Sequence, residues 1–522
     1  MVSWEIVSKA TSFIAEEMGV ALRRSSLSPN IKERSDHSCA VADDKGNIVA
    51  QAEHIPVHLG SLRIGIKNLL SEIKKKEIEI NEGDMIVSND PFITGTHLND
   101  VTLLAPIFHN DKIIGYVANK AHHIDIGGPI YGSINPFAST IYDEGFIIPP
   151  VKIVENGVLR RDLLDVFLSN VKVPKISEGD FKAQIAANMT GIRRIKEAIA
   201  RYGVKNLMEG WESTILHTYK LSIDEISKWP SGEYVAEDYL EVGEKEIVGL
   251  KAKVKIGNDK VEVEFQDVPE QIDKPFNAVF GVTFSAVSFA VRSIIKQEIP
   301  VNEGFYSIIE IKAKKGTMLN PLPPAPVSGG NLETSQRIAD LIFLALSKAM
   351  PSLVPAAGSG TMMNVMMGGF DSFRKQRWAY YETIGGGTGG RPDSDGVSGV
   401  HVDMTNTMNT PIEVAEATYP IIFTSYRIRE GSGGDGIHKG GDGIIRSFKV
   451  LSKTKVSIMG SRFLTSPWGL KGGKPGKRAR VIVRKANGEE ILLNPMFTLL
   501  LDEGDEIIIE TPGGGGYGNK NG

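Results

Sequence analysis

VTLLAPIFHNDKIIGYVANKAHHIDIGG, from Val101 to Gly128, is the stretch that most constrains the fold. Two runs of apolar and β-branched residues are separated by Asn110 and Asp111, which are typical of tight turns. The stretch therefore predicts a β-hairpin. Its second strand leads directly into a His-His-Ile-Asp sequence, so the same hairpin is expected to carry chemically active side chains.

The rest of the chain predicts a mixed α/β (α+β) fold. Apolar residues recur at helical spacing in residues 4–22, 61–76 and 334–350, and residues 176–229 contain long runs without Gly or Pro. Short alternating runs around residues 39–50 and 254–265 predict two further hairpins. The last hundred residues alternate apolar runs with Gly-rich turns, which predicts a β-rich C-terminal third.

These patterns divide the chain into three regions. Residues 1–232 are expected to form an N-terminal metal-binding α/β region, and residues 233–331 a middle α+β region. Residues 332–522 are expected to form a Gly-rich, β-rich C-terminal region. The helical stretch of the first region ends at Pro230-Ser231-Gly232, a sequence that favours a chain turn.

Composition excludes several classes of protein. Lys plus Arg number 59 and Asp plus Glu 63, so the net charge of −4 gives no electrostatic footprint for nucleic acid. No continuous apolar run reaches the ~20 residues that a membrane-spanning helix needs. Cys39 is the single cysteine, which excludes an intrachain disulfide and favours a cytoplasmic location. Its apolar neighbours favour a buried structural thiol over a nucleophile.

The histidines are concentrated in one part of the chain. Seven of the ten lie between His37 and His123, and three of these are close to carboxylates. The two sequences concerned are Thr96-His97-Leu98-Asn99-Asp100 and His122-His123-Ile124-Asp125. Imidazole and carboxylate together suit a first-row divalent metal such as Mn, Zn or Fe.

Spacing sets which of these residues can share one ion. His97 and Asp100 are three residues apart and face the same way in a turn. If residues 119–125 are extended, His123 and Asp125 lie on one face of the strand and His122 on the other. Alternation then favours His123 as the ligand, unless the strand ends at this point. The candidate metal ligands are therefore His97, Asp100, one of His122 and His123, and Asp125.

His54 and His58 form a separate pair. Pro56 between them argues against the interior of a helix, and in an extended chain the two residues lie roughly 13 Å apart. They are therefore not expected to share one ion. Contact with the substrate or support of the metal ligands is one interpretation, and ordinary hydrogen-bonded histidines are the other.

The glycine run at residues 385–391 is a further candidate site. Its backbone N–H groups favour either an anion contact or a structural turn. No Gly-Lys-Ser/Thr follows it, so it is not a P-loop. If the reaction uses ATP, another chain is expected to bind the nucleotide.

Several of these stretches together resemble the hydantoinase B/5-oxoprolinase family along most of the chain. The resemblance implies a soluble subunit that works with a hydantoinase A-type ATPase subunit, which binds ATP and Mg. It also implies a dimer of this chain within a hetero-oligomer. The stretches that carry the resemblance are Ser28–Asp36, Ala50–Gly60, Asn89–Asp100, Ala121–Gly128, Arg391–Gly396, Asn406–Glu416 and Ser432–Gly443.

The resemblance also implies a reaction. Members of the family hydrolyse cyclic amides such as hydantoins, 5-oxoproline or lactams in an ATP-dependent reaction. The partner activates the ring by phosphorylation, and this chain supplies a metal-activated water. By the resemblance, His97, Asp100 and the His122–Asp125 segment map to metal ligands, and Asp36 or a nearby histidine, His54 or His58, is a candidate general base.

Two other functions stay open at this level. A related branch of the family, the acetone-type carboxylases, uses the same pairing of subunits to carboxylate a ketone. A non-catalytic scaffold for the A subunit is the alternative from another class. Metal content separates the scaffold from either enzyme, and dependence on bicarbonate separates the carboxylase from the hydrolase.

Overall fold

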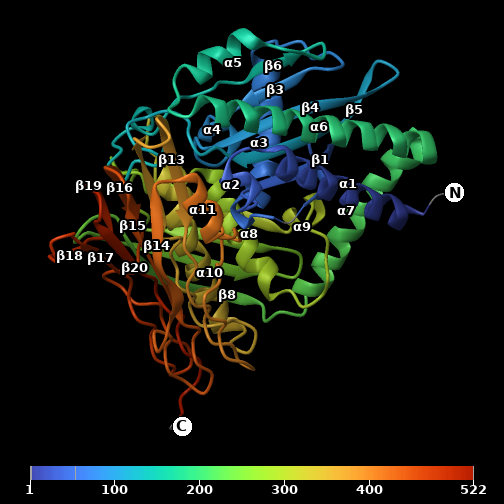
Figure 1. The fold of residues 1–522 in the computed structure, drawn as a ribbon. Helices are drawn as coiled ribbons and strands as arrows, with labels where there is room; N and C mark the ends of the chain where they lie inside the picture. The colour runs from blue at the N-terminus through green and yellow to red at the C-terminus, as the bar shows by residue number, and fades with distance from the viewer. Residues whose placement is uncertain (1–2, 53, 521–522) are drawn as a thin grey trace.

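The structure is a computed structural model that describes residues 3–52 and 54–520, and it confirms the α+β prediction (Figure 1). The strands form four β-sheets, and helices pack against and between them. One continuous hydrophobic core includes side chains from Val7 to Met459. The division into regions 1–232, 233–331 and 332–522 stays a prediction.

The first sheet contains the predicted hairpin at its centre. All of its neighbouring strands are antiparallel, and Val101 pairs with Ala121 across the hairpin. The central strands consist almost entirely of buried residues because helices cover the sheet. In spatial order, the strands are β2 (Ile48–Gln51), β1 (His37–Asp43), β5 (Lys112–His122), β4 (Asp100–His109), β3 (Met85–Ser88), β6 (Val151–Glu155) and β7 (Val158–Leu159).

Three long helices pack together beside this sheet. Helix α1 (Trp4–Ser25) packs on α6 (Pro174–Tyr202) and α7 (Val204–Ile226), and α6 also contacts β4 and β5. Pro174 opens α6 at a position where its missing N–H costs no hydrogen bond. Gly203, with a φ of +83°, separates α6 from α7. The helices predicted at residues 4–22 and 176–229 are thereby confirmed.

The start of the next helix differs from the prediction. Helix α3 begins at Pro56 rather than Ser61 and runs to Lys75. Proline is unfavourable inside a helix but favourable in its first turn, where the backbone N–H has no partner within the helix. The assumption of an extended chain between His54 and His58 was therefore wrong, since His58 lies in the first turn of α3.

A second sheet and two buried helices form the middle of the molecule. The sheet is mixed, because β10 and β11 are parallel and its other neighbours are antiparallel. Helix α8 (Phe280–Ile294) packs between α3 and α10 (Ser335–Ala349), and α10 lies on β8 and β9. In spatial order, the strands are β11 (Ile309–Lys312), β10 (Val261–Gln266), β9 (Ile247–Ile256) and β8 (Gly232–Glu241).

The C-terminal third forms two antiparallel sheets that share a hydrophobic core, as its β-rich pattern predicts. They lie on the left of Figure 1. The first contains, in order, β13 (Gln376–Thr383), β12 (Asn364–Asp371), β16 (Thr454–Met459) and β19 (Met496–Leu501). The second contains β14 (Ile421–Arg429), β15 (Gly443–Val450), β20 (Glu506–Glu510), β17 (Arg480–Arg484) and β18 (Glu490–Leu493).

Glycine-rich loops pack backbone against backbone beneath these sheets. A Cβ atom on Gly387 would lie 1.8 Å from the carbonyl oxygen of Gly441, so no larger residue fits there. The N–H groups of Gly386, Gly387 and Gly390 donate to carbonyl oxygens of the chain. This pairing favours the structural interpretation of the glycine run over the anion contact.

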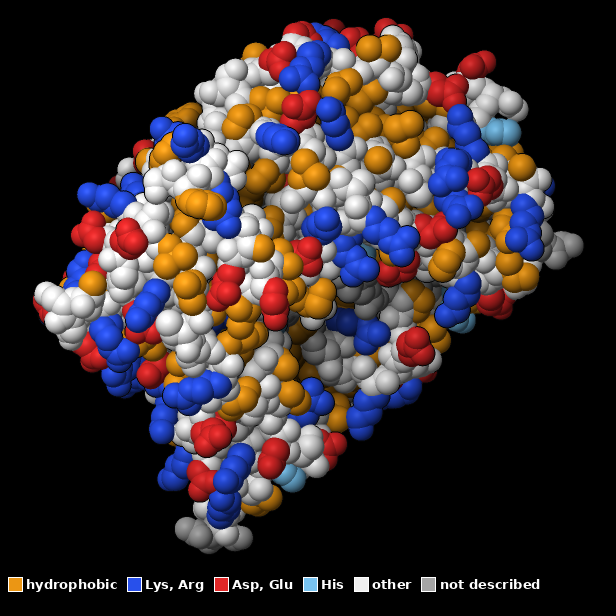
Figure 2. Space-filling view, viewed as in Figure 1, with side chains coloured by type: hydrophobic (Ala, Val, Ile, Leu, Met, Phe, Trp, Pro, Cys, Tyr) orange, Lys and Arg blue, Asp and Glu red, His pale blue; other side chains and the backbone are white. Residues whose placement is uncertain are grey.

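The remaining elements are short and join the larger ones. They are α2 (Pro29–Lys32), α4 (Pro91–Thr94), the 3-10 helix η1 (Ile141–Asp143), α5 (Arg161–Leu168), α9 (Glu303–Tyr306), the π-helix η2 (Gly330–Thr334) and α11 (Ile412–Thr418). Among the described residues, no helix combines the length and apolarity needed to cross a membrane. Positive and negative side chains are interspersed over the face shown in Figure 2, in keeping with the nearly balanced charge.

Candidate metal centre

The register of the central hairpin brings two candidate ligands together. Asp100 opens β4 and His122 ends β5, and the two are directly paired across the strands. Side chains of such a pair lie on the same face of the sheet, about 4.5–5.5 Å apart at Cβ. His97 comes from the turn three residues before Asp100 and points to the same place.

The ligand atoms of these three residues form a compact buried group. One atom from each of His97, Asp100 and His122 lies within 4.8 Å of the other two. Asp100 Oδ1 is 3.1 Å from His97 Nε2 and 3.4 Å from His122 Nδ1. His58 Nε2 lies 3.3 Å from Asp100 Oδ2 on the other side of the carboxylate.

The side chains of this group lie close together, but hydrogen bonds do not pair their polar atoms. Both ring nitrogens of His97 and both carboxylate oxygens of Asp100 are buried without a hydrogen-bond partner among the described residues. Buried polar atoms normally have a hydrogen-bond partner, so four unpaired atoms on two neighbouring side chains require an explanation. A divalent ion between imidazole and carboxylate atoms provides one, and the donor set suits Mn, Zn or Fe.

The electrostatics keep this carboxylate ionised. Burial by itself raises the pKa of Asp100, but the neighbouring imidazoles of His97, His58 and His122 hold that pKa well below its usual range. Burial lowers the pKa of His122, which favours the neutral imidazole that binds a metal. Both states are those that a metal ligand needs.

A buried lysine fixes the turn that carries His97. Lys120 Nζ donates to the carbonyl oxygen of Thr94 at 2.8 Å and to Thr96 Oγ1 at 2.7 Å. Burial lowers the pKa of Lys120 to about 8. Lys120 lies on β5 two residues before His122, so a single strand positions both a candidate ligand and the support of another.

Asp36 and His58, two of the predicted catalytic residues, also reach this place. His58 Nδ1 lies 3.2 Å from Ser38 Oγ, which orients its Nε2 toward Asp100. Asp36 Oδ2 lies 3.9 Å from His122 Nδ1 and 3.8 Å from the guanidinium of Arg34. Both separations are too long for direct hydrogen bonds, so the Asp36 carboxylate retains acceptor capacity toward the cavity.

The cavity beside the ligand group is small and lies among buried side chains. It has a volume of about 20 Å³, which is room for one water molecule or ion. Every lining residue is buried. The lining residues are Asp36, Ile55, Val57, His58, Asp100, His122, Asn331, Leu332, Met362, Tyr381, Thr383, Met404, Thr405 and Thr407.

Several of these lining residues were not predicted. Tyr381 stacks on His122 with ring centroids 4.6 Å apart, and its hydroxyl donates to Asn364 Oδ1 at 2.9 Å. Asn331 lies in the π-helix η2, and its buried Oδ1 has no described partner. A short π-helical turn often marks a functional site, but its sequence, Gly330-Asn331-Leu332-Glu333-Thr334, has no pattern that sets it apart.

The structure does not bring the other three predicted residues to the cavity. The prediction that favoured His123 was wrong, because the register pairs His122 with Asp100 and the next residue, His123, faces the other way, with Nε2 2.9 Å from Gln184 Oε1. Asp125 accepts hydrogen bonds from the N–H groups of Gly127 and Val173. His54 instead contacts His37, with ring centroids 4.8 Å apart and the rings tilted by 51°, and pairs with Glu16 at 3.4 Å.

Two other features are separate from this chemistry. Cys39 is fully buried and burial raises the pKa of its thiol, in keeping with a structural role.

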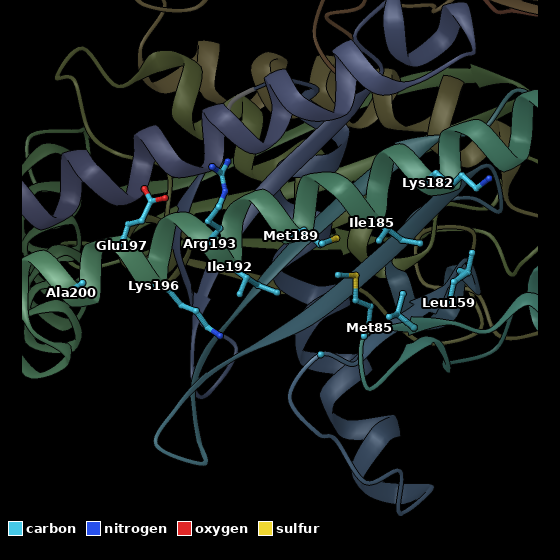
Figure 3. A pocket seen from close by; sticks show the side chains of 13 residues that line it. Met85, Leu159, Lys182, Ile185, Met189, Ile192, Arg193, Lys196, Glu197 and Ala200 are labelled. Carbon is cyan, nitrogen blue, oxygen red and sulfur yellow. The ribbon is translucent and has the colours of Figure 1, made fainter.

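An open groove of about 720 Å³ lies between α6 and the β3–β7 edge, and apolar side chains such as Met85, Leu159 and Met189 point into it (Figure 3). No histidine or predicted site residue lines this groove.

The fold and this group of side chains define a class of protein. The family model described as hydantoinase B/oxoprolinase matches residues 1–520, and the chain belongs to that family.

Curated relatives agree with the family. The chain is 49% identical to an uncharacterised protein of Methanocaldococcus jannaschii, over 99% of this chain and 90% of that protein. It is 31% identical to a putative D-/L-hydantoinase B subunit from a Pseudomonas species, over 99% of this chain and 89% of that protein. It is 36% identical to 5-oxoprolinase 1 of Arabidopsis thaliana over 97% of this chain, and spans only 41% of that longer protein.

Two solved structures share the fold. The ATP-dependent caprolactamase from Pseudomonas jessenii superimposes with a TM-score of 0.91 at 28% identity, over 99% of this chain and 90% of that chain. An acetone carboxylase superimposes with a TM-score of 0.92 at 18% identity, over 99% of this chain and 75% of that chain. The second likeness shows a common fold alone.

Proposed function

We propose that this chain is the B-type component of an ATP-dependent cyclic amidohydrolase that opens hydantoin, 5-oxoproline or lactam rings. The observation that carries the proposal is the unpaired, buried His97–Asp100–His122 group beside a cavity that holds one water or ion. The names of the relatives support the substrate class, because they include a 5-oxoprolinase, a hydantoinase and a caprolactamase.

His97, Asp100 and His122 would hold the metal. A divalent ion there supplies Lewis acidity and lowers the pKa of a water molecule from 15.7 to about 7. His58 supports the site by its contact with Asp100, and Tyr381 supports it by stacking on His122. His123, Asp125 and His54 are left outside this assignment because each is satisfied or positioned elsewhere.

Asp36 is the residue best placed to take a proton from water in the cavity. Its carboxylate lines the cavity. Arg34 and His122 lie within 4 Å of this carboxylate but form no hydrogen bond with it, so its oxygens can still accept a proton. Asn331 lies in the same wall with an unpaired carbonyl oxygen that can accept a hydrogen bond from water. Complete burial of the lining excludes bulk water from this step.

Activation by ATP is assigned to a partner. The sequence contains no nucleotide-binding motif of the P-loop type. A relative that matches nearly all of this chain is named as the B component of a hydantoinase, which supports a hydantoinase A-type ATPase subunit as the partner. We propose that this partner binds ATP and Mg and activates the ring, and that the assembled hetero-oligomer contains two copies of this chain.

The proposal is tested by metal analysis and by ring opening. The purified chain is expected to bind about one Mn, Zn or Fe, and the His97→Ala/Asp100→Ala variant none, by elemental mass spectrometry. With the A subunit and ATP, the variant is expected to lose ring opening of hydantoin, 5-oxoproline and caprolactam while the partner retains ATPase activity. His109→Ala, at the other end of β4, is the matched control. Full ring opening in the double variant would refute the metal-assisted mechanism.

A further inference from the structure

The proposed reaction has a problem of size. The cavity beside His97 and Asp100 holds about 20 Å³, whereas pockets that bind small molecules usually measure about 300–1,000 Å³. Every residue around that cavity is buried, and a ring does not fit into it in this conformation. A ring substrate therefore needs a larger site next to it.

One pocket of the described residues meets this requirement. It has a volume of about 510 Å³ and lies between the end of α8, the end of α10 and the loops at residues 388–393 and 401–403. Val402 and Asp403 line this pocket, whereas the next two residues, Met404 and Thr405, line the metal cavity. A single length of irregular chain therefore separates the two spaces.

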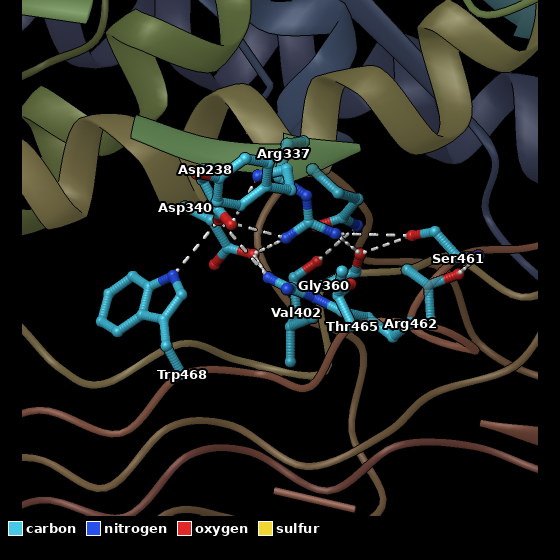
Figure 4. A network of polar contacts seen from close by, with 12 residues as sticks. Asp238, Arg337, Asp340, Gly360, Val402, Ser461, Arg462, Thr465 and Trp468 are labelled. Carbon is cyan, nitrogen blue, oxygen red and sulfur yellow. Dashed lines mark hydrogen bonds and ion pairs between the residues drawn. The ribbon is translucent and has the colours of Figure 1, made fainter. Parts of the chain in front are cut away.

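The separating wall is held by a few specific bonds. Gln336 Nε2 donates to the carbonyl oxygen of Val402 at 3.1 Å, and the N–H of Val57 donates to that of Met404 at 3.3 Å. Asp403 has a φ of +51°, a left-handed conformation that is uncommon for a residue other than glycine. Beneath the wall, Arg337, Asp340 and Arg462 form a rigid ion-pair network close to Val402 (Figure 4).

The lining of the pocket is half apolar and half polar. Phe289, Ile294, Phe343 and Leu353 provide the apolar side. On the polar side, both ring nitrogens of His401 are buried and have no hydrogen-bond partner among the described residues. The Oδ2 atom of Asp403 is also buried and unpaired, although both side chains are only partly buried as a whole.

The charge state of these groups selects the kind of ligand. Burial lowers the pKa of His401 to about 3, so at neutral pH its ring is uncharged and offers one N–H donor and one acceptor. Burial also raises the pKa of Asp403 to about 7, although Arg337 opposes the shift. The uncharged His401 ring beside an apolar wall matches a ring that carries both an N–H and a C=O group, whereas the charged lining residues Lys296, Arg391 and Asp393 are exposed.

We infer that this pocket, which we call the His401 pocket, is the site where the cyclic amide binds, on the other side of the Val402–Met404 wall from the metal cavity. The inference rests on the proposed function for the identity of the ligand. It names a second site, with its own residues, for that same reaction. His401 and Asp403 pair with the amide group of the ring, and the four apolar side chains contact its carbon atoms.

A blocking substitution tests the pocket without touching its buried wall. Ser293 is exposed at the rim, and its Oγ donates to the carbonyl oxygen four residues earlier. Ser293→Trp is expected to fill the pocket and weaken the binding of hydantoin to the full chain at least tenfold by ligand-observed NMR, with Mn present. Ser169→Trp is the matched control, because Ser169 is exposed, directly follows α5 and donates to the carbonyl oxygen of Asp165, four residues earlier.

A second variant tests the polar groups. His401→Leu keeps a side chain of similar bulk and removes both nitrogens, so it is also expected to weaken hydantoin binding at least tenfold. Metal content is expected to stay at the wild-type value in both variants, and with the A subunit KM is expected to rise more than kcat falls. If His401→Leu does not fold, Ser293→Trp alone decides.

The outcomes separate the two proposals. Hydantoin binding that is absent in the wild-type chain, or unchanged by Ser293→Trp, overturns the His401 pocket even if ring opening is observed. Binding that depends on the pocket, without ring opening of any cyclic amide by wild-type chain and partner, leaves the pocket in place and overturns the proposed hydrolase. Loss of metal in the Ser293→Trp variant would also overturn the pocket as a separate site.

Discussion

Two buried polar clusters in this molecule differ in how completely their side chains hydrogen-bond one another. Near β8 and α10, the Asp340 Oδ2 atom accepts hydrogen bonds from Arg337 and Arg462, each at 2.8 Å. In the N-terminal sheet, His97 and Asp100 lie 3.1 Å apart without a hydrogen bond between them. The charged groups of the first cluster hydrogen-bond one another, although Asp340 Oδ1 and the Nε atoms of Arg337 and Arg462 stay unpaired, whereas His97 and Asp100 in the second have no hydrogen bond to a described residue on any of their four polar side-chain atoms. Proximity alone does not distinguish them, but the geometry of their bonds does.

The largest effect on stability is expected at the first cluster. Asp340→Ala removes the nearer of two carboxylates shared by the buried guanidinium groups and leaves them only Asp238, at 3.3 and 3.5 Å. Removing one partner of a buried ion pair costs about 3–5 kcal/mol. Urea denaturation of the wild type and variant measures this loss. Asp224→Ala, which breaks the exposed pair with Lys228, is the control and is expected to cost far less. Equal effects of the two substitutions would show that the network contributes no more than a surface pair.

The next effect is expected at the second cluster and depends on metal. A ligand that binds only the folded state at a free concentration of one hundred times its Kd stabilises it by about 2.7 kcal/mol. Added Mn or Zn is therefore expected to raise the thermal midpoint of the wild type and to leave the His97→Ala/Asp100→Ala variant unchanged. A similar rise in both proteins would place the ion elsewhere.

A pH effect is expected at Glu333, which lies between the two clusters. Its Oε1 atom accepts from Asn364, which in turn accepts from Tyr381, and burial raises the pKa of Glu333 to about 7 from 4.5. Between these values the unfolded state has lost its proton and the folded state has not. Stability therefore falls as pH rises from 4.5 to about 7, by up to about 1.4 kcal/mol per pH unit for this group.

Glu333→Gln removes that dependence and keeps the acceptor for Asn364. The free energy of unfolding of the variant, measured in urea between about pH 4.5 and 7.5, is expected to fall less steeply than that of the wild type. Other groups titrate in both proteins and cancel in the difference. Parallel curves would mean that Glu333 is already ionised in the folded state.

The smallest effect is expected at His123. This residue lies next to His122 but hydrogen-bonds Gln184, so His123→Gln is expected to cost about 1 kcal/mol of stability. It is expected to keep one bound metal per chain, whereas His122→Gln loses it. Elemental analysis of the two variants decides between the neighbouring histidines, and loss of metal only in His123→Gln would reverse the assignment.

Local patterns were sufficient for much of the fold. The hairpin at Val101–Ala118, the helices at residues 176–229 and the β-rich C-terminal third follow from periodicity and turn residues, which act over a few positions. The start of α3 at Pro56 was missed because proline is compatible with both a first helical turn and an extended chain. Only the packing of the following residues selects between these states.

The sequence by itself determined the fold class and the pairing of His97 with Asp100, because both depend on neighbours within a few residues of each other. It also carried the likeness to the family, through motifs spread along the chain. The choice of His122 over His123 was decided by the tertiary structure, since it depends on the register that pairs His122 with Asp100 across β4 and β5. The positions of Asn331, Tyr381 and His401 required it too, because cavities form between segments that lie hundreds of residues apart in the chain.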